Sequence, residues 1–175
     1  EITGRSGVSY IRTIRVTLIA TGSVWKYHDG GTSQGTAWRE LGFNDDAWKS
    51  GPAELGFDEG DEATLVNGGP AGARFPTIYF RHKFRVPDPS IFDSLLIRLR
   101  RDDGAVVYLN GVEVFRSNML DGTISYTTLS DGTTDSETAF YPKEIAPEEL
   151  LAGDNVVAVE VHQAAVDSSD LSFEL

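Results

Sequence analysis

Residues 95–115 have the sequence LLIRLRRDDGAVVYLNGVEVF, and this stretch decides the fold class. Leu95, Ile97 and Leu99 recur at every second position, which predicts a strand with one buried face. The apolar run 105–109 and the run 112–115 flank Asn110-Gly111. Asn-Gly suits a type I′ turn because both central residues need a positive φ. We therefore expect a strand, a turn at 102–104, and then a β-hairpin.

Short strands with the same alternation are predicted on both sides of this stretch. Residues 78–86 place apolar side chains on one face, His82 among them as a core histidine, and end at Pro87, which cannot donate to a sheet. Other strands are marked by Ile14, Val16 and Leu18; by 64–66; by Val157, Val159 and Val161; and by Leu171, Phe173 and Leu175. Only short helical turns are expected, at 44–48 and 147–151. The pattern predicts an all-β fold, an antiparallel β-sandwich.

Composition narrows the function classes. The chain has 175 residues with a net charge of −12, from 15 Lys+Arg and 27 Asp+Glu. Such a surface repels phosphate backbones and anionic lipids, so nucleic-acid and membrane-surface partners are not expected. No apolar run approaches the roughly 20 residues of a membrane span. No signal peptide is recognised, which suggests a mature chain or an excised module.

The chain has no cysteine, which excludes disulfides, thiolate nucleophiles and Cys-ligated metals. Its three histidines, His28, His82 and His162, share no ligand spacing, so a zinc site is not expected.

Several motifs recur in a known kind of module. They are Trp25-Lys26-Tyr27, 45–48, 51–56, 79–81, 102–111, 158–163 and 168–170. With them the chain resembles the galactose-binding-domain-like jelly-roll modules of large exported bacterial proteins, over residues 22–175. The resemblance implies an appended, non-catalytic domain, often stabilised by calcium, in an extracellular or cell-surface protein. Residues 1–21 would hold a first strand and a candidate linker from a preceding module.

Asp102 and Asp103 form the first candidate site. Paired carboxylates repel each other unless a cation or donors compensate, and calcium takes six to eight oxygen ligands. The run is also similar to the aspartate pair of yeast-adhesin-type sugar-binding domains, which implies a calcium ion that holds sugar hydroxyls. The alternative is structural: Asp102 pairs with Arg100 or Arg101, and Asp103 makes an Asx-turn.

A second candidate site combines His162 and Gln163, at the end of one strand, with Asp170, at the start of the next. Neighbouring strand ends would bring an imidazole, an amide and a carboxylate together, which suits hydrogen bonding to a sugar. Alternation places His162 on the same sheet face as Glu160. The alternative is that Asp170 only accepts from Ser168 or a backbone N–H.

By the resemblance, Glu174 of the last strand and the loop near Asp29 are candidates for a structural calcium site. The alternative for Glu174 is a solvated strand face. The acidic run 58–62 lacks the spacing of an EF-hand loop and is expected to be a solvated loop.

Aromatic side chains are candidate sugar platforms because a ring face packs well on a pyranose. Most are expected to pack in the core instead, and Trp38, in a polar loop, is the candidate for exposure. The leading function is therefore a carbohydrate-binding module, with a polysaccharide or glycan and the other domains of its polypeptide as partners.

Two alternatives remain. A structural or protein-docking domain would lack both an exposed aromatic and a concave polar cluster. A glycosidase or lyase would need two suitably spaced carboxylates, and 27 acidic residues do not exclude such a pair.

Overall fold

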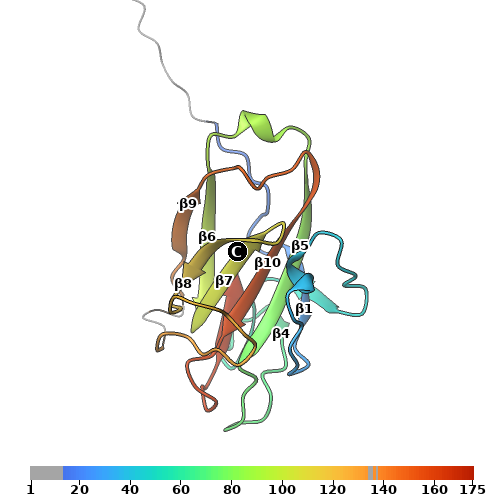
Figure 1. Cartoon of the computed structure of the whole chain (residues 1–175). Helices are drawn as coiled ribbons and strands as arrows, with labels where there is room; N and C mark the ends of the chain where they lie inside the picture. The colour runs from blue at the N-terminus through green and yellow to red at the C-terminus, as the bar shows by residue number, and fades with distance from the viewer. Residues whose placement is uncertain (1–13, 134–135, 137) are drawn as a thin grey trace, which may run out of the picture.

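Two facing β-sheets form a sandwich (Figure 1). The computed structural model of the chain describes residues 14–133, 136 and 138–175. The six-stranded sheet has the order β2 (Lys49–Pro52), β1 (Val24–His28), β5 (Thr77–Val86), β10 (Gly153–His162), β7 (Gly104–Leu109), β8 (Val112–Ser117). The five-stranded sheet has the order β4 (Thr64–Leu65), β3 (Leu55–Phe57), β11 (Leu171–Glu174), β6 (Leu95–Asp102), β9 (Tyr141–Ile145). The predicted all-β antiparallel sandwich is confirmed, with one parallel pair, β3 and β4.

In the described part of the chain, helical structure is limited to two 3-10 turns, η1 (Ala37–Arg39) and η2 (Pro89–Ile91). The expected helical turns at 44–48 and 147–151 are hydrogen-bonded turns instead: Trp48 N donates to Asp45 O, and Leu150 N to Pro147 O. Among the described residues, no helix is long and apolar enough to span a bilayer.

The decisive stretch 95–115 folds as predicted, with one difference in its connectivity. Asn110 and Gly111 form the hairpin turn between β7 and β8 with φ of 51° and 92°. The turn at 102–104 does not join neighbouring strands, because β6 and β7 belong to different sheets. It is a corner at which the chain passes from one layer of the sandwich to the other.

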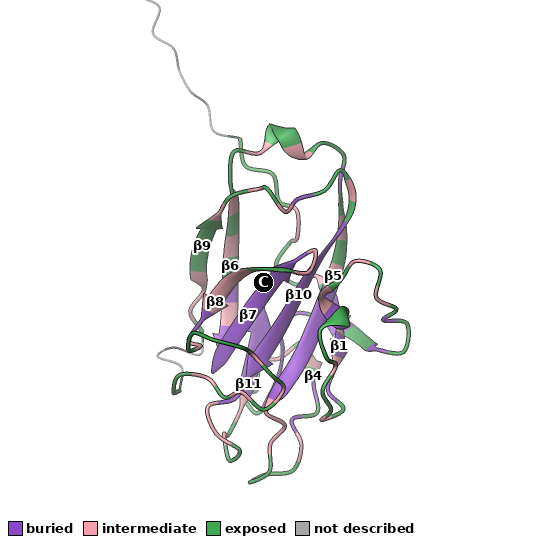
Figure 2. Ribbon diagram, viewed as in Figure 1, coloured by how far each residue is buried: buried purple, intermediate pink, exposed green. Residues whose placement is uncertain are grey.

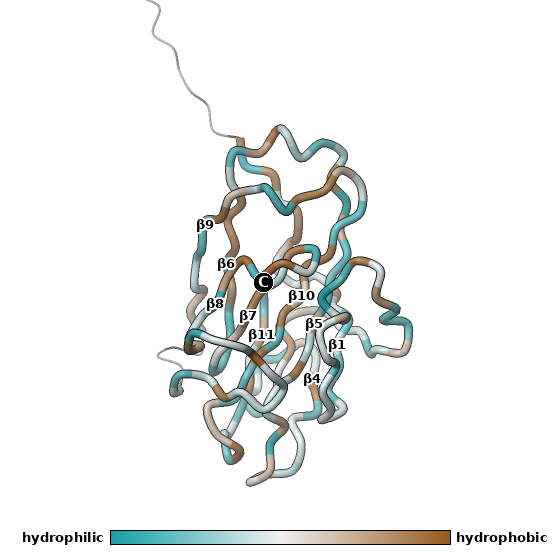
Figure 3. The backbone as a smooth tube through the Cα atoms, in the orientation of Figure 1, coloured by the Kyte–Doolittle hydropathy of each residue, from teal (hydrophilic) through white to brown (hydrophobic). Residues whose placement is uncertain are grey.

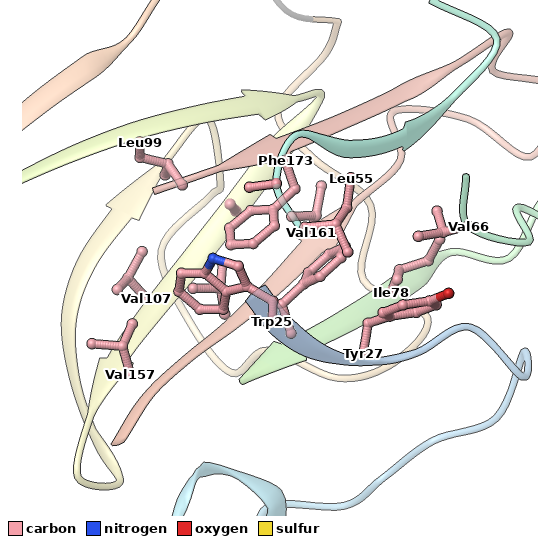
Figure 4. Close-up of a cluster of buried hydrophobic side chains, with 14 of the residues drawn as sticks. Trp25, Tyr27, Leu55, Val66, Ile78, Leu99, Val107, Val157, Val161 and Phe173 are labelled. Atoms are coloured by element: carbon pink, nitrogen blue, oxygen red, sulfur yellow. The ribbon is translucent and has the colours of Figure 1, made fainter. Parts of the chain in front are cut away.

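The main core fills the space between the sheets. Trp25 meets Phe173 edge-on at 4.9 Å between ring centroids, and Phe80 stacks on Phe173 at 4.1 Å. Figure 4 shows this core, in which side chains from both sheets point toward one another. Strand β7 is buried along its whole length and is coloured mainly as hydrophobic (Figures 2 and 3).

A second apolar cluster covers the outer face of the six-stranded sheet. It is formed by buried side chains of the sheet and of the 30–48 loop: Trp38, Trp48, Tyr79, Val106, Tyr108 and Ala158. Both faces of β5 are therefore covered over residues 77–81, and Arg81 is fully buried even though alternation places it away from the main core. Arg81 Nε donates to Asp45 Oδ2 at 2.8 Å, which holds the loop on the sheet.

Two predictions about local structure are wrong. Residues 14–18 form no strand, and Ile14 and Val16 are 77% and 55% exposed. His82 is not a core histidine, because its ring is only partly buried beside Trp25, and its Nδ1 bonds Val24 O. The part of the candidate linker that falls on residues 1–13 lies outside the described part of the chain.

Candidate functional site

Three chain segments meet where the inner strands of the five-stranded sheet end. Strand β11 pairs antiparallel with β3 on one side and with β6 on the other, so that Ser172 lies between Gly56 and Asp102. The C-terminal ends of β3 and β6 therefore lie beside the N-terminal end of β11. This arrangement brings together Glu59, Asp102 and Asp170, which are far apart in the sequence.

These three residues form a carboxylate cluster. One oxygen from each side chain lies within 4.8 Å of the other two. Asp102 is 2% exposed. Burial raises the pKa of Asp102 to about 9, and the neighbouring carboxylates of Asp103 and Asp170 add to the shift. The cluster therefore favours either a proton or a cation at its centre.

Asp103 has a different role from Asp102. Its Oδ2 accepts from Ala164 N at 2.7 Å and from Ser168 Oγ at 3.0 Å, while its carbonyl oxygen accepts from Arg101 Nη1 and Asn118 Nδ2. The donors to Oδ2 lie in the 164–170 loop and not at Gly104, where the alternative of an Asx-turn places them. Asp103 attaches that loop to the corner between the sheets.

The predicted ion pair of Asp102 with a neighbouring arginine is wrong. Arg100 pairs with Glu54, and Asp102 forms no ion pair with any described residue.

A hollow of about 440 Å³ opens beside the cluster. We call it the acidic hollow; its walls are carboxylates, hydroxyls and two alanines from Asp102, Asp103, Thr133, Ala164, Ala165, Asp167, Ser168, Ser169 and Asp170. It lies at the end of the sandwich opposite η2, where the loops gather in Figure 1. The hollow is a concave polar surface made mainly by one loop, 164–170.

Arg74 braces the loops around the hollow. Its Nη2 donates to Asp58 Oδ2 at 2.8 Å and to Ser169 O at 2.9 Å, and its Nε donates to Ser168 O at 3.2 Å. Arg74 N also donates to Val166 O. One arginine thus joins the loop that follows β3 to the loop that precedes β11.

The acidic run 58–62 is a loop in which Asp58, Gly60 and Asp61 are exposed, in agreement with the expectation of a solvated loop, and its carboxylates also make specific contacts. Asp58 pairs with Arg74, and the Glu62 carboxylate accepts from the backbone N–H groups of Glu59 and Gly60 at 2.7 and 2.9 Å. Glu59 faces the cluster. The run is an ordered loop in which each of three acids has a distinct partner.

His162 and Gln163 are fully buried, and neither lines the hollow. His162 lies with Glu160 on the outer face of β10, as alternation predicted, and their Nε2 and Oε2 atoms are 3.5 Å apart. Its Nδ1 donates to Thr128 O at 2.7 Å. Gln163 Nε2 donates to the backbone oxygen of Asp170 at 3.2 Å, so Gln163 supports Asp170 from behind.

Asp170 itself lines the hollow and is half-buried. Its Oδ1 accepts from Ser169 Oγ at 2.9 Å, not from Ser168 as the alternative proposed. Of the predicted ligand-binding residues, the structure brings Asp102, Asp103 and Asp170 together and leaves His162 and Gln163 beneath the surface.

Trp38 is 0% exposed, so the prediction of an exposed platform is wrong. Its ring meets Tyr79 at 4.7 Å and Tyr108 at 5.8 Å inside the outer-face cluster. The polar loop around it folds over the sheet and turns the indole inward. Throughout the described residues, no tryptophan, tyrosine or phenylalanine is exposed.

Asp29 and Glu174 do not form a joint calcium site. Glu174 Oε1 accepts from Gly22 N at 2.9 Å, before β1 begins. Asp29 follows β1, and its Oδ2 accepts from Lys49 Nζ and Asn67 N, both at 2.8 Å. The two carboxylates thus lie at opposite ends of β1, and each already has a donor. Both are buried, so the alternative of a solvated strand face is wrong for Glu174.

Sequence reasoning missed Glu59 and Arg74. Neither belongs to a spaced motif, because their partners lie more than a strand away along the chain. Only the strand order β3-β11-β6 makes them neighbours. The sequence shows an excess of acidic residues at predicted strand ends, but this pattern does not indicate which of them lie close together in the fold.

Comparison with known proteins supports the fold. No family model matches the sequence, and no curated protein matches it either. Solved structures do match. A beta-glucuronidase from glycoside hydrolase family 2 matches with a TM-score of 0.50 and 18% identity, over 86% of this chain and 15% of that one. A beta-glycosidase from Bacteroides vulgatus matches with a TM-score of 0.51 and 15% identity, over 91% of this chain and 20% of that one, and a calcium binding mutant of Bacteroides uniformis beta-glucuronidase 2 with a TM-score of 0.50 and 15% identity, over 87% and 17%.

The chain spans only 15–20% of the length of these three enzymes. At such identities the likeness establishes a shared sandwich fold, which accounts for only a small part of the larger chains.

Proposed function

We propose that this chain is a non-catalytic carbohydrate-binding domain of a larger, exported, glycan-processing protein. The observation that carries the proposal is the acidic hollow, a concave surface lined by carboxylates and hydroxyls. Groups of this kind accept and donate hydrogen bonds to the vicinal hydroxyls of a sugar. The structural neighbours, which are glycoside hydrolases with further domains, support a glycan as partner.

The chemistry of the hollow favours one kind of ligand. Its acidic wall disfavours uronates and other anionic sugars, because they would add charge to Asp102, Asp103, Asp167 and Asp170. Since no described aromatic ring is exposed, binding would depend on polar contacts instead of stacking. We therefore propose a neutral oligosaccharide, bound through its hydroxyl groups.

The experiment is a glycan array followed by titration of the best ligand. Asp167→Asn tests the hollow, because Asp167 is exposed, lines it and lies outside the carboxylate cluster. Asp93→Asn is the matched control, an exposed aspartate beside η2 at the opposite end. We expect neutral glycans to bind the wild type and the control alike and Asp167→Asn more weakly. No glycan binding, with calcium present, would contradict the proposal.

A structural or docking domain is the second candidate. The observation that favours it is the absence of an exposed aromatic ring among the described residues. It predicts that no glycan binds while a neighbouring domain of the same polypeptide does. Co-purification of this chain with separately expressed flanking domains distinguishes the two candidates.

A further inference from the structure

A second hollow lies beside the outer face of the six-stranded sheet, where β1 and β5 pair (Figure 1). It encloses about 310 Å³ and is lined by Val24 and Lys26 of β1, Ser50 of β2, Arg81, His82 and Lys83 of β5, and Asp45. We call it the basic hollow, and it shares no lining residue with the acidic hollow. Three cations thus meet one carboxylate, in a chain that has 27 acids and 15 bases.

The strand register places these cations next to one another. Lys26 pairs with Ser50 on β2 and with Arg81 on β5, so the three side chains form a row across the sheet. Lys83 follows Arg81 by two positions and therefore lies on the same face. Like charges directly opposite each other on two strands are destabilising, so the row is unfavourable unless an anion compensates it.

The described residues compensate only part of this charge. Asp45 Oδ2 accepts from Arg81 Nε at 2.8 Å, and its Oδ1 lies 3.7 Å from Lys83 Nζ. Lys26 Nζ donates to the carbonyl oxygen of Trp48 at 3.3 Å and forms no ion pair with a described residue. Arg81 Nη2 is buried and has no acceptor in the described part of the chain.

Lys26 and Lys83 are the cations that a ligand can reach. The Lys83 side chain is 49% exposed and Lys26 is half-buried, whereas Arg81 is fully buried and adds its charge without being accessible. Ser50 and Val24 are exposed beside them. The hollow thus offers two ammonium groups, a hydroxyl and an apolar surface, which suit a small polar ligand with one anionic group.

The volume limits the size of the ligand. At about 310 Å³ the hollow is at the lower end of the roughly 300–1,000 Å³ of small-molecule sites, so it suits one sugar ring better than a peptide segment. We propose that the basic hollow binds one acidic sugar unit, with the carboxylate on Lys26 and Lys83 and a ring hydroxyl on Ser50. This site goes beyond the neutral-glycan function proposed for the acidic hollow, and neither proposal depends on the other.

The test follows the backbone amide signals of the protein in ¹H–¹⁵N spectra. The protein is titrated at low salt with sodium glucuronate and, separately, with sodium galacturonate. Binding through two partly exposed lysines should be weak, with a dissociation constant of about 1 mM. We expect saturable shifts centred on Lys26, Ser50 and Lys83, and weaker binding in about 0.5 M NaCl, because salt screens the charges.

Matched probes and variants make the test specific. Glucose and galactose lack the carboxylate and acetate lacks the ring, so each should shift these signals at least about fivefold more weakly. Lys26→Gln and Lys83→Gln should each weaken uronate binding by about threefold, and the double variant by about tenfold. Lys143→Gln, at an exposed position on β9 of the other sheet, is the control and should bind as the wild type does. The melting temperature of each variant checks that it is folded.

The absence of saturable shifts with either uronate at about 10 mM would overturn the proposal. Equal binding by the folded double variant and the wild type would also overturn it, and acetate binding as tight as that of the uronates would overturn the assignment to a sugar. Asp167→Asn, which tests the acidic hollow, should bind uronates as the wild type does. Uronate binding at the basic hollow without neutral-glycan binding would therefore leave this proposal standing and contradict the function, and the reverse result would do the opposite.

Discussion

The phenol of Tyr108 donates to Glu160 Oε1 at 2.6 Å in a part of the protein from which water is excluded. The two residues are 2% and 1% exposed. Arg39 Nη2 reaches the same oxygen at 3.1 Å, and its guanidinium carbon lies 4.1 Å from the centroid of the Tyr108 ring, in a cation–π contact. This contact attaches the loop containing η1 to strands β7 and β10.

Replacing Glu160 by Gln should destabilise the protein by about 3 kcal/mol at neutral pH. The amide keeps the shape of the side chain but leaves Arg39 without a counter-charge in a largely buried position. Urea unfolding at pH 7 measures the difference. A midpoint equal to that of the wild type would show that the carboxylate does not stabilise the outer-face cluster.

The same variant should show a pH-dependent difference. Burial by itself raises the pKa of Glu160, but the hydrogen bond and charge of His162, the Tyr108 phenol and Arg39 outweigh burial and leave the pKa below 4.5. A carboxyl group with a lowered folded-state pKa stabilises the protein above its unfolded value, and this stabilisation is lost as the pH falls. The gap between wild type and Glu160→Gln should therefore narrow below pH 4.5, measured as a series of urea midpoints. A gap that widens in acid would contradict the assignment.

Trp38→Ala should cost about 3–5 kcal/mol, because the indole is fully buried against Tyr79 and Tyr108. Thermal unfolding followed by near-ultraviolet circular dichroism reports both the loss of stability and the loss of the aromatic signal. Ile91→Ala, at a site 66% exposed in η2, is the control and should be nearly neutral. Equal effects of the two substitutions would contradict the buried position of Trp38.

Gly111→Ala should destabilise the β7–β8 hairpin. Gly111 has φ of 92°, and a Cβ there would lie 2.5 Å from Glu40 Oε1. Backbone strain alone accounts for about 1–2 kcal/mol. Gly72→Ala is the matched control, with φ of 77° and nothing within 4 Å of the added carbon. Chemical denaturation should therefore show a larger loss for Gly111→Ala than for Gly72→Ala, and the opposite order would be inconsistent with the crowding by Glu40.

Arg74→Gln should loosen the loops around the acidic hollow without unfolding the sheets. Arg74 donates to Asp58 and to the carbonyl oxygens of Ser168 and Ser169, and glutamine cannot reach all three. Limited proteolysis should cut within 164–170 faster than in the wild type, while far-ultraviolet circular dichroism stays unchanged. Arg98→Gln, an exposed arginine on β6, should keep the wild-type cleavage rate.

Most strands could be predicted because alternation and turn chemistry are local. The long strands β5, β6 and β10 and the Asn110-Gly111 hairpin fall where the pattern places them. The same reasoning failed for residues 14–18, because alternation does not require a partner strand, and Ile14 and Val16 remain exposed. Trp38 was misjudged because its polar neighbours describe the loop and not the apolar sheet face beneath it.

The candidate site could be predicted only in part. Asp102, Asp103 and Asp170 are predictable as site candidates because they are acids at strand ends, and all three line the hollow. Asp103 accepts hydrogen bonds from the 164–170 loop, whereas Asp102 lies in the carboxylate cluster. Two adjacent aspartates in a sequence do not indicate which of them faces the loop. The contribution of Glu59 depends on β3 and β6 flanking β11, a property of the whole sheet order.

Strand β10 has a partner along both sides, with β5 at ten positions and with β7 at six. Its amide hydrogens should therefore be among the last to exchange with solvent, since they are released only when the six-stranded sheet opens. Glu160 lies on this strand, and the 164–170 loop begins two residues beyond its end. The loops at the hollow can therefore fluctuate locally while the six-stranded sheet that carries them opens only in global unfolding.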